Sequence, residues 1–180
     1  MKLPIVKSRE ICAQSNIFKV ERMQIEFSNG SNVEYERLVG SERGAVLVVA
    51  INDDSKVLMI KEYAAGVGRY ELALPKGKID PNETVVEAAN RELMEEIGFG
   101  ANNLNHFTSY SIAPGYLSHH THIVLAQDLY PKKLIGDEPE PIIVEAWDFK
   151  DLTKMVSLPY MTEARSIAAL YQVRDMLGYG

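Results

Sequence analysis

The chain has 180 residues, of which 46% are hydrophobic and 24% are charged, and its formal net charge at pH 7 is -6. This length and composition suit one domain with a sizeable core and a small extension, and they exclude a second full domain. An acidic chain without a run of Lys and Arg argues against a nucleic-acid or anionic-membrane partner, so we expect a small-molecule substrate.

The cysteine content and the N-terminal residues bear on the cellular compartment. Cys12 is the only cysteine, so no internal disulfide is possible. Residues 1–10 contain neither the apolar core of a signal peptide nor a membrane-spanning segment. We therefore expect a cytoplasmic protein.

The first 43 residues are predicted to form a β-hairpin extension. Residues 17–27 and 33–38 are rich in β-branched and aromatic side chains, and the sequence SNGS at 28–31 is typical of a hairpin turn. An isolated two-stranded hairpin is marginal in water, so we expect its surface to be covered by a second copy of the chain in a homodimer. The main domain is then expected over 44–180.

The main domain is predicted to contain both strands and helices. The predicted strands are 45–51, 56–62, 70–74, 105–113, 120–128 and 142–149. A central helix and two C-terminal helices, 151–156 and 162–177, complete the pattern. A long polar loop at 130–141 precedes the last strand. This mixture indicates an α+β fold.

The central helix is predicted over residues 83–97, an uninterrupted run of good helix formers that Gly98 ends. At about 100° per residue, Glu92, Glu95 and Glu96 fall in one sector, roughly 90° from the apolar sector. Three like charges at this spacing repel one another, so a bound cation would explain their grouping. Oxygen ligands select a hard divalent ion such as Mg2+. The alternative for the carboxylates alone is a solvated acidic helix face.

The same stretch matches a longer pattern, G-x5-E-x7-R-E-U-x-E-E-x-G-U, in which U is a bulky apolar residue. All nine fixed positions are present: Gly77, Glu83, Arg91, Glu92, Leu93, Glu95, Glu96, Gly98 and Phe99. This pattern resembles the Nudix box without a departure. The resemblance implies an α/β/α sandwich around a mixed β-sheet, and a metal-dependent hydrolase of nucleoside diphosphates linked to another group.

The resemblance also implies roles for the residues of the box. The expected ligands of Mg2+ or Mn2+ are Glu92, Glu95, Glu96 and the backbone carbonyl of Lys76. The residues expected to shape the motif are Gly77, Glu83, Arg91 and Gly98. Glu83 lies on the far side of the helix from the acidic sector, so we expect it to hold the preceding loop, through Arg91, instead of binding metal.

Residues outside the box are expected to complete the site. Relatives that cleave ADP-ribose carry a catalytic glutamate on the loop before the last strand, which makes Glu140 the first candidate for the base and Glu138 the second. Glu95 follows if neither is the base. The candidate substrate contacts are Arg69 and Lys61, the nearest upstream cations, and Pro114, close to the position of a marker proline in these relatives.

Three stretches, 27–38, 60–101 with the box inside it, and 126–141, resemble bacterial Nudix enzymes that hydrolyse ADP compounds. The resemblance implies hydrolysis of ADP-ribose, NADH and short diadenosine polyphosphates with release of AMP, by a homodimer. Two alternatives share the box. A nucleoside triphosphate or RNA-end pyrophosphohydrolase would need a different base pocket, and a non-catalytic Nudix sensor usually departs from the box at its glutamates.

Overall fold

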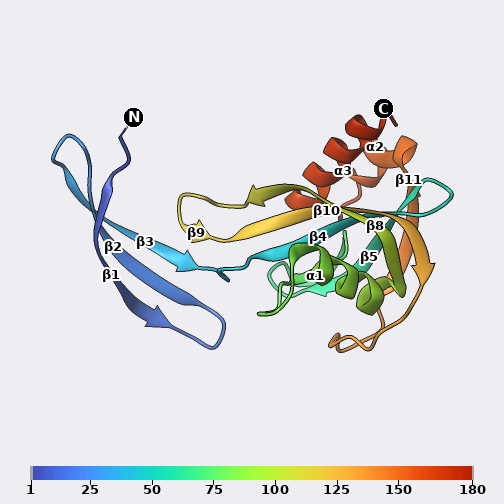
Figure 1. Cartoon of the computed structure of the whole chain (residues 1–180), viewed down its shortest axis with the longest axis horizontal. Helices are drawn as coiled ribbons and strands as arrows, with labels where there is room; N and C mark the ends of the chain where they lie inside the picture. Colours follow the sequence, from blue (N-terminus) through green and yellow to red (C-terminus); the bar gives the residue numbers. More distant parts are fainter. Residues whose placement is uncertain (1, 180) are drawn as a thin grey trace. The chain divides into compact units, whose positions relative to one another are not determined.

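The computed structural model describes residues 2–179 and divides into two units. The first unit holds the residues up to Gly44 together with 111–120, and the second holds 45–110 with the residues from 121 onward (Figure 1). The division after Gly44 lies one residue from the predicted boundary at 43. Residues 111–120 belong to the first unit and not, as we expected, to the main domain, because they carry a short strand that pairs with the N-terminal sheet.

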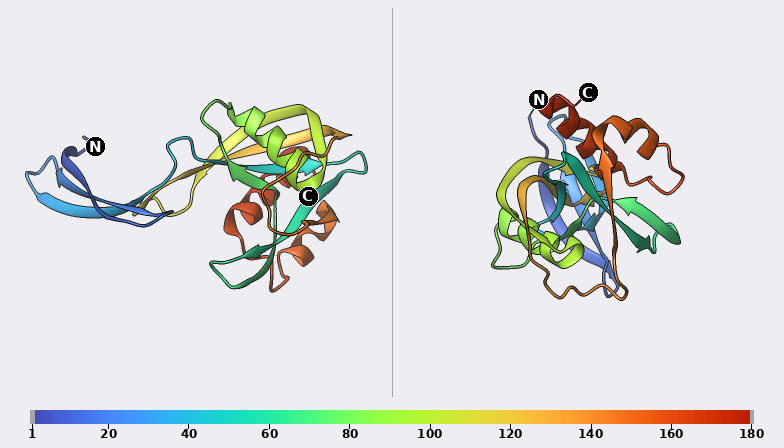
Figure 2. Two further views of the ribbon diagram at one scale, coloured as in Figure 1. Left: turned by 90° about the horizontal axis from the view of Figure 1, so that it is seen from below. Right: turned by 90° about the vertical axis from the view of Figure 1, so that its right-hand side faces the viewer.

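The first unit is a four-stranded sheet in the order β1-β2-β3-β9, drawn mainly in blue in Figure 2. Its strands are β1 (Ile5–Gln14), β2 (Lys19–Glu26), β3 (Asn32–Val39) and β9 (Leu117–Ser118). The first three pair antiparallel, and β9 pairs parallel to β3. The expected hairpin is therefore correct for β2 and β3, but the extension has a further strand, β1. Every residue of β1 is exposed, so β1 has no alternation of buried and exposed residues that would reveal it.

The second unit is built on a seven-stranded mixed sheet. Its strands are β4 (Ala45–Ile51), β5 (Lys56–Ala64), β6 (Arg69–Ala73), β7 (Lys76–Lys78), β8 (Phe99–Ser111), β10 (His120–Pro131) and β11 (Ile143–Asp148). The order is β11-β5-β4-β10-β8, with β6 on β5 and β7 on β4. β10 runs parallel to β4, whereas β5 and β7 run antiparallel to it. β7 was not predicted, because it falls within the turn-forming residues before the central helix.

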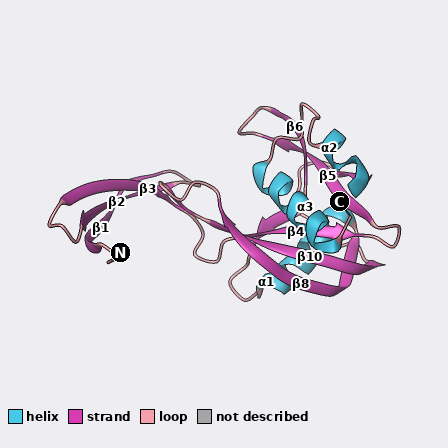
Figure 3. Ribbon diagram, turned by 90° about the horizontal axis from the view of Figure 1, so that it is seen from above, coloured by secondary structure: helices cyan, strands magenta, loops and turns pink. Residues whose placement is uncertain are grey.

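Helices cover both faces of this sheet, as Figures 1 and 3 show. Alternate residues of β4 point to opposite faces. One face packs on α1 (Val85–Glu92) through Val46, Val48 and Ala50. The other packs on α2 (Leu152–Met155) and α3 (Ala164–Leu177) through Leu47, Val49 and Ile51. This layering confirms the expected α/β/α sandwich. None of the helices within residues 2–179 is long and apolar enough to span a membrane.

The central helix begins at Val85, two residues later than predicted, because Thr84 is its N-cap. The Thr84 hydroxyl accepts a bond from Glu87 N (3.2 Å), and the Glu87 carboxylate accepts one from Thr84 N (2.8 Å), which completes a capping box. From Leu93 to Ile97 the helix widens into a π-helical turn. It ends at Gly98, whose φ of 77° is the left-handed conformation that glycine adopts readily. Such π-helical turns are frequent at functional sites.

Candidate active site

The glutamates of the central helix are only partly accessible to solvent. Glu92 and Glu96 are 8% and 5% exposed, and Glu95 is half-buried. Glu92 lies in the last turn of α1, and the other two lie in the π-helical turn. Buried carboxylates need hydrogen bonds or an opposite charge nearby, which a solvated helix face would not need. The burial therefore argues against a merely solvated acidic face.

The β7 strand brings the backbone against these carboxylates. A Cβ atom at Gly77 would overlap the Glu92 carboxylate, so a larger residue here would displace that carboxylate from its present position. The next residue upstream, Lys76, donates its backbone N–H to Glu96 Oε2 at 2.9 Å. The Lys76 peptide, which we expected to offer its carbonyl to a metal, thus lies beside the acidic cluster.

Arg91 links the helix to the loop that precedes it. Its Nη1 donates to Glu92 Oε1 at 2.7 Å and to Glu95 Oε2 at 2.8 Å. Its Nε donates to Glu83 Oε1 at 2.7 Å, and its Nη2 donates to the Lys78 carbonyl at 2.9 Å. The expected contact between Glu83 and Arg91 is present. The guanidinium therefore fixes the loop and orients two box carboxylates at once.

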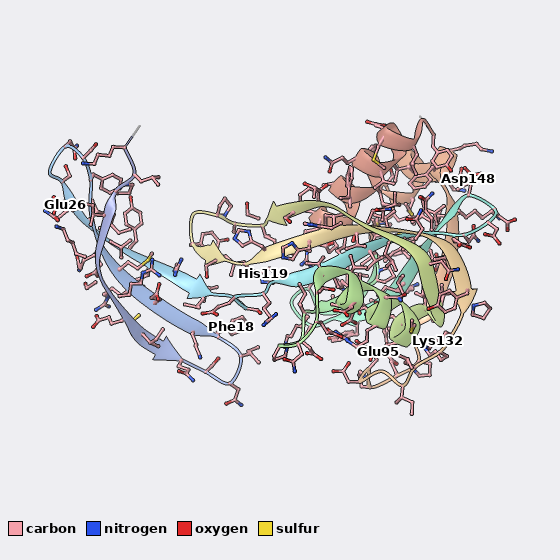
Figure 4. All side chains as sticks on the ribbon, in the orientation of Figure 1. Phe18, Glu26, Glu95, His119, Lys132 and Asp148 are labelled. Atoms are coloured by element: carbon pink, nitrogen blue, oxygen red, sulfur yellow. The ribbon has the colours of Figure 1, made fainter. Side chains whose placement is uncertain are left out.

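The loop over residues 132–142, between β10 and β11, is attached to the C-terminal end of the central helix. Lys132 N donates to the Gly98 carbonyl at 3.0 Å, and the Lys133 ammonium donates to the Glu95 carbonyl. Figure 4 shows Glu95 and Lys132 close to each other at this junction. Glutamates of the helix and the loop line a cavity of about 400 Å3: Glu92, Glu95, Glu96, Glu138 and Glu140. The loop predicted to carry the base thus borders the carboxylates of the box.

A carboxylate from a third element joins the cluster. Oxygens of Glu62, Glu96 and Glu138 all lie within 4.8 Å of one another. Glu62 lies near the end of β5 and was not identified from the sequence. A signal was nonetheless present, because Leu58 and Ile60 pack against α1, and a period of two residues places position 62 on the same face.

The electrostatics of this cluster favour a bound cation. Burial, together with neighbouring carboxylates such as Glu92, raises the pKa of Glu96 to about 8. Burial likewise raises the pKa of Glu92 to about 7 and raises the pKa of Glu138 above its usual range. The available donors are carboxylate and carbonyl oxygens, which are the ligands of hard divalent ions. The donor set therefore fits Mg2+ or Mn2+.

The remaining candidates are dispersed. Glu140 accepts a hydrogen bond from the Tyr70 hydroxyl at 2.5 Å. Arg69 donates to Glu71 at 2.5 Å and to the Thr162 hydroxyl at 3.2 Å, so its guanidinium is engaged outside the acidic cluster.

The last two residues predicted to contact the substrate are Lys61 and Pro114. The Lys61 ammonium lies 4.7 Å from the centre of the Tyr160 ring, on the face of β5 opposite to Glu62, although Lys61 also lines a cavity beside Glu138. Pro114 belongs to the first unit, where it lines a cavity of about 240 Å3 together with Phe27.

Comparison with known proteins identifies the family of the chain. Residues 41–170 match the model of the NUDIX domain. The chain belongs to the Nudix hydrolase family. Residues 4–37 also match a second model, the NudE-type Nudix hydrolase N-terminal domain, which corresponds to the first three strands of the N-terminal sheet.

Individual Nudix relatives share nearly the whole chain. ADP compounds hydrolase NudE of Escherichia coli strain K12 is 47% identical over 98% of this chain and 95% of its own length. ADP-ribose pyrophosphatase of Bacillus subtilis strain 168 is 30% identical over 81% of this chain and 79% of its own. A crystal structure of an ADP compounds hydrolase superimposes with a TM-score of 0.92 and 46% identity, covering 100% of this chain and 97% of that one.

Proposed function

We propose that this Nudix hydrolase cleaves the diphosphate linkage of ADP-containing compounds, such as ADP-ribose, NADH and diadenosine polyphosphates, and releases AMP. The observation that carries the proposal is that the helix glutamates Glu92, Glu95 and Glu96 line one cavity with Glu138. Glu62 joins them, because its carboxylate lies within 4.8 Å of those of Glu96 and Glu138. The similarity to the E. coli ADP compounds hydrolase extends over nearly both chains and supports the choice of substrate.

The box residues are proposed to hold Mg2+ or Mn2+ in this reaction. The proposed ligands are Glu92, Glu95, Glu96 and the Lys76 carbonyl. When bound, the metal would neutralise the diphosphate and polarise the attacking water. Arg91 would keep two of these carboxylates in place through its bonds to Glu92 and Glu95, and Gly77 would let the β7 backbone approach them. Without a cation, an acidic cavity would repel a diphosphate.

A carboxylate outside the box is proposed to accept the proton of the attacking water. Sequence reasoning ranked Glu140 first, but the geometry favours Glu138, because its carboxylate lies within 4.8 Å of those of Glu62 and Glu96. The Glu140 carboxylate instead accepts the Tyr70 hydroxyl. Burial also raises the pKa of Glu138, which brings it nearer to the range of an efficient general base.

A substrate panel tests this function and separates it from the alternatives. We expect Mg2+-dependent AMP release from ADP-ribose, NADH and diadenosine triphosphate, and little turnover of GDP-mannose or dGTP. Preferential hydrolysis of dGTP or of triphosphorylated RNA ends would favour a pyrophosphohydrolase. No turnover of any compound with Mg2+ or Mn2+ would favour a sensor and contradict the proposal.

We propose further that the protein works in the cytoplasm as a homodimer on small molecules, without nucleic-acid or membrane partners. The dimer is supported by apolar side chains that the N-terminal unit exposes, among them Ile5 and Ile11 on β1 and Phe18 in the β1–β2 turn, which are 51%, 50% and 57% exposed. Val6, Ile25 and Val33 are cross-strand partners in one row of the sheet, and a contiguous apolar patch of this kind is typical of an interface.

A further inference from the structure

Two tyrosines stand at the end of the β5–β6 hairpin, next to the acidic cluster. Tyr63 on β5 is the cross-strand partner of Tyr70 on β6. Their ring centroids lie 5.7 Å apart with an interplanar angle of 71°, an edge-to-face contact. Tyr63 is 56% exposed and Tyr70 is 45% exposed, so packing in the hydrophobic core does not explain the position of either ring.

The rings border the loop that carries the candidate base. The Tyr70 hydroxyl donates to Glu140 Oε1 at 2.5 Å, which joins the hairpin to the loop. Tyr63 lines a cavity of about 180 Å3 together with charged side chains and apolar loop residues. The cavity residues are Lys61, Glu62, Tyr63, Glu138, Pro139, Glu140, Pro141 and Ile142. Glu62 and Glu138 also belong to the carboxylate cluster, so this cavity adjoins the site of bond cleavage proposed above.

The composition of the cavity suits a flat aromatic group. Charged side chains line it, and Tyr63 and the two loop prolines add apolar surface on which a base could lie. Stacking on an aromatic side chain contributes about 1–3 kcal/mol per base and tolerates every base, because each has a π-face.

We propose that Tyr63 forms a stacking subsite for the second base of a dinucleotide substrate. The second base is the one that does not belong to the ADP group shared by all the proposed substrates. Tyr70 is a positioning residue, which supports the Tyr63 ring by its edge and holds the loop through Glu140. This inference rests on the proposed function and names dinucleotides as the substrate class that gains from the subsite. ADP-ribose has no second base, so it gains nothing from Tyr63.

The test compares substrates with and without a second base in the same variants. Tyr63→Ala should lower kcat/KM for NADH and diadenosine triphosphate about 10- to 100-fold and leave kcat/KM for ADP-ribose within about twofold. A 10- to 100-fold loss corresponds to about 1.4–2.8 kcal/mol, which lies within the range for stacking of one base. Tyr63→Phe retains the ring and should behave like the wild type. Val67→Ala is the matched control, because Val67 is exposed in the turn of the same hairpin and does not line the cavity.

A binding measurement keeps this inference separate from the proposed function. With Ca2+ in place of Mg2+, calorimetry should show that Tyr63→Ala weakens binding of NAD+ at least tenfold but leaves ADP-ribose binding unchanged. An equal loss for both ligands would mean that Tyr63 contacts a part common to both. No loss for either would mean that Tyr63 is an exposed residue that contacts no ligand. Each of these results overturns the subsite, and so does failure of the wild type to bind NAD+. If the wild type hydrolysed no substrate but Tyr63→Ala still weakened NAD+ binding, the result would contradict the proposed hydrolase function and not the subsite.

Discussion

The Lys76 ammonium forms an ion pair with the Glu62 carboxylate inside the candidate active site, where the two side chains are 22% and 20% exposed. The backbone N–H of the same lysine donates to Glu96. One residue thus contacts two of the three carboxylates that gather at this point. Its positive charge also partly offsets the rise that burial and neighbouring carboxylates cause in the pKa of the third, Glu138. Lys76 therefore serves as the counter-ion of the cluster when no other cation is there.

Replacing this lysine should change the affinity for metal. Lys76→Met removes a cation that competes with a divalent ion for the same carboxylates. Mn2+ should therefore bind about tenfold more tightly, which corresponds to a gain of about 1.4 kcal/mol in binding free energy. The measurement is Mn2+ titration followed by electron paramagnetic resonance. Lys78→Met is the control, because the Lys78 side chain is exposed on the same strand and should leave the affinity unchanged. Unchanged or weaker Mn2+ binding by Lys76→Met would mean that the ion pair does not compete with metal.

Glu96→Gln tests the assignment of the metal ligands. The substitution keeps the shape of the buried side chain but removes one ligand charge, so turnover and Mn2+ affinity should both fall by orders of magnitude while the circular dichroism spectrum is retained. Glu87→Gln on the same helix is the matched control, since a glutamine at this position of the capping box can still accept the Thr84 N–H. Near-normal Mn2+ binding by Glu96→Gln would remove Glu96 from the ligand set.

The two loop glutamates should differ in their contributions to turnover. We expect Glu138→Gln to lower kcat by about 10²- to 10⁴-fold, the usual size of a general-base contribution, with little change in KM. Glu140→Gln should cost much less, because its carboxylate accepts the Tyr70 hydroxyl and is not one of the three that lie within 4.8 Å of one another. The reverse order would restore the ranking based on sequence. If both single variants and the double variant turn over normally, the base lies in the box, and Glu95 is the next candidate.

The N-terminal sheet should mediate a homodimer. Ile5→Lys combined with Ile11→Lys places two charges on the exposed strand β1, where both side chains are about half exposed, so the single chain should remain folded. We expect the wild type to sediment as a dimer and the double variant as a monomer. Lys2→Glu, a charge change at an exposed position before β1, is the control. A monomeric wild type, or a double variant that stays dimeric, would contradict this role.

The parts of the molecule that were predictable from sequence are those with a strong local signal. The continuous apolar run of β4 predicted a buried strand, and all its residues after Ala45 are buried. The spacing of glycine, arginine and glutamates in the box predicted that Glu92 and Glu96 lie together, and both line one cavity although Glu96 lies beyond α1. Gly98 was correctly expected to end the helix.

The parts that were not predictable depend on contacts between distant segments. β1 is exposed throughout and is held by cross-strand pairing and ion pairs such as Lys7 with Glu26 (2.6 Å), neither of which leaves a periodic pattern. Glu62 reaches the site only because β5 lies beside the loop that carries Glu138. The π-helical turn widens the helix at the site, which a fixed angle of about 100° per residue does not describe.

Hydrolysis of ADP-ribose in ¹⁸O-labelled water with Mg2+ tests the central claim most directly. If water attacks a phosphorus of the diphosphate, mass spectrometry will find the label in the phosphate group of AMP or of ribose 5-phosphate, and the Glu96→Gln variant will form neither labelled product at a comparable rate. Label on a sugar carbon would exclude attack at phosphorus and contradict the mechanism, and the absence of any AMP would contradict the proposed function itself.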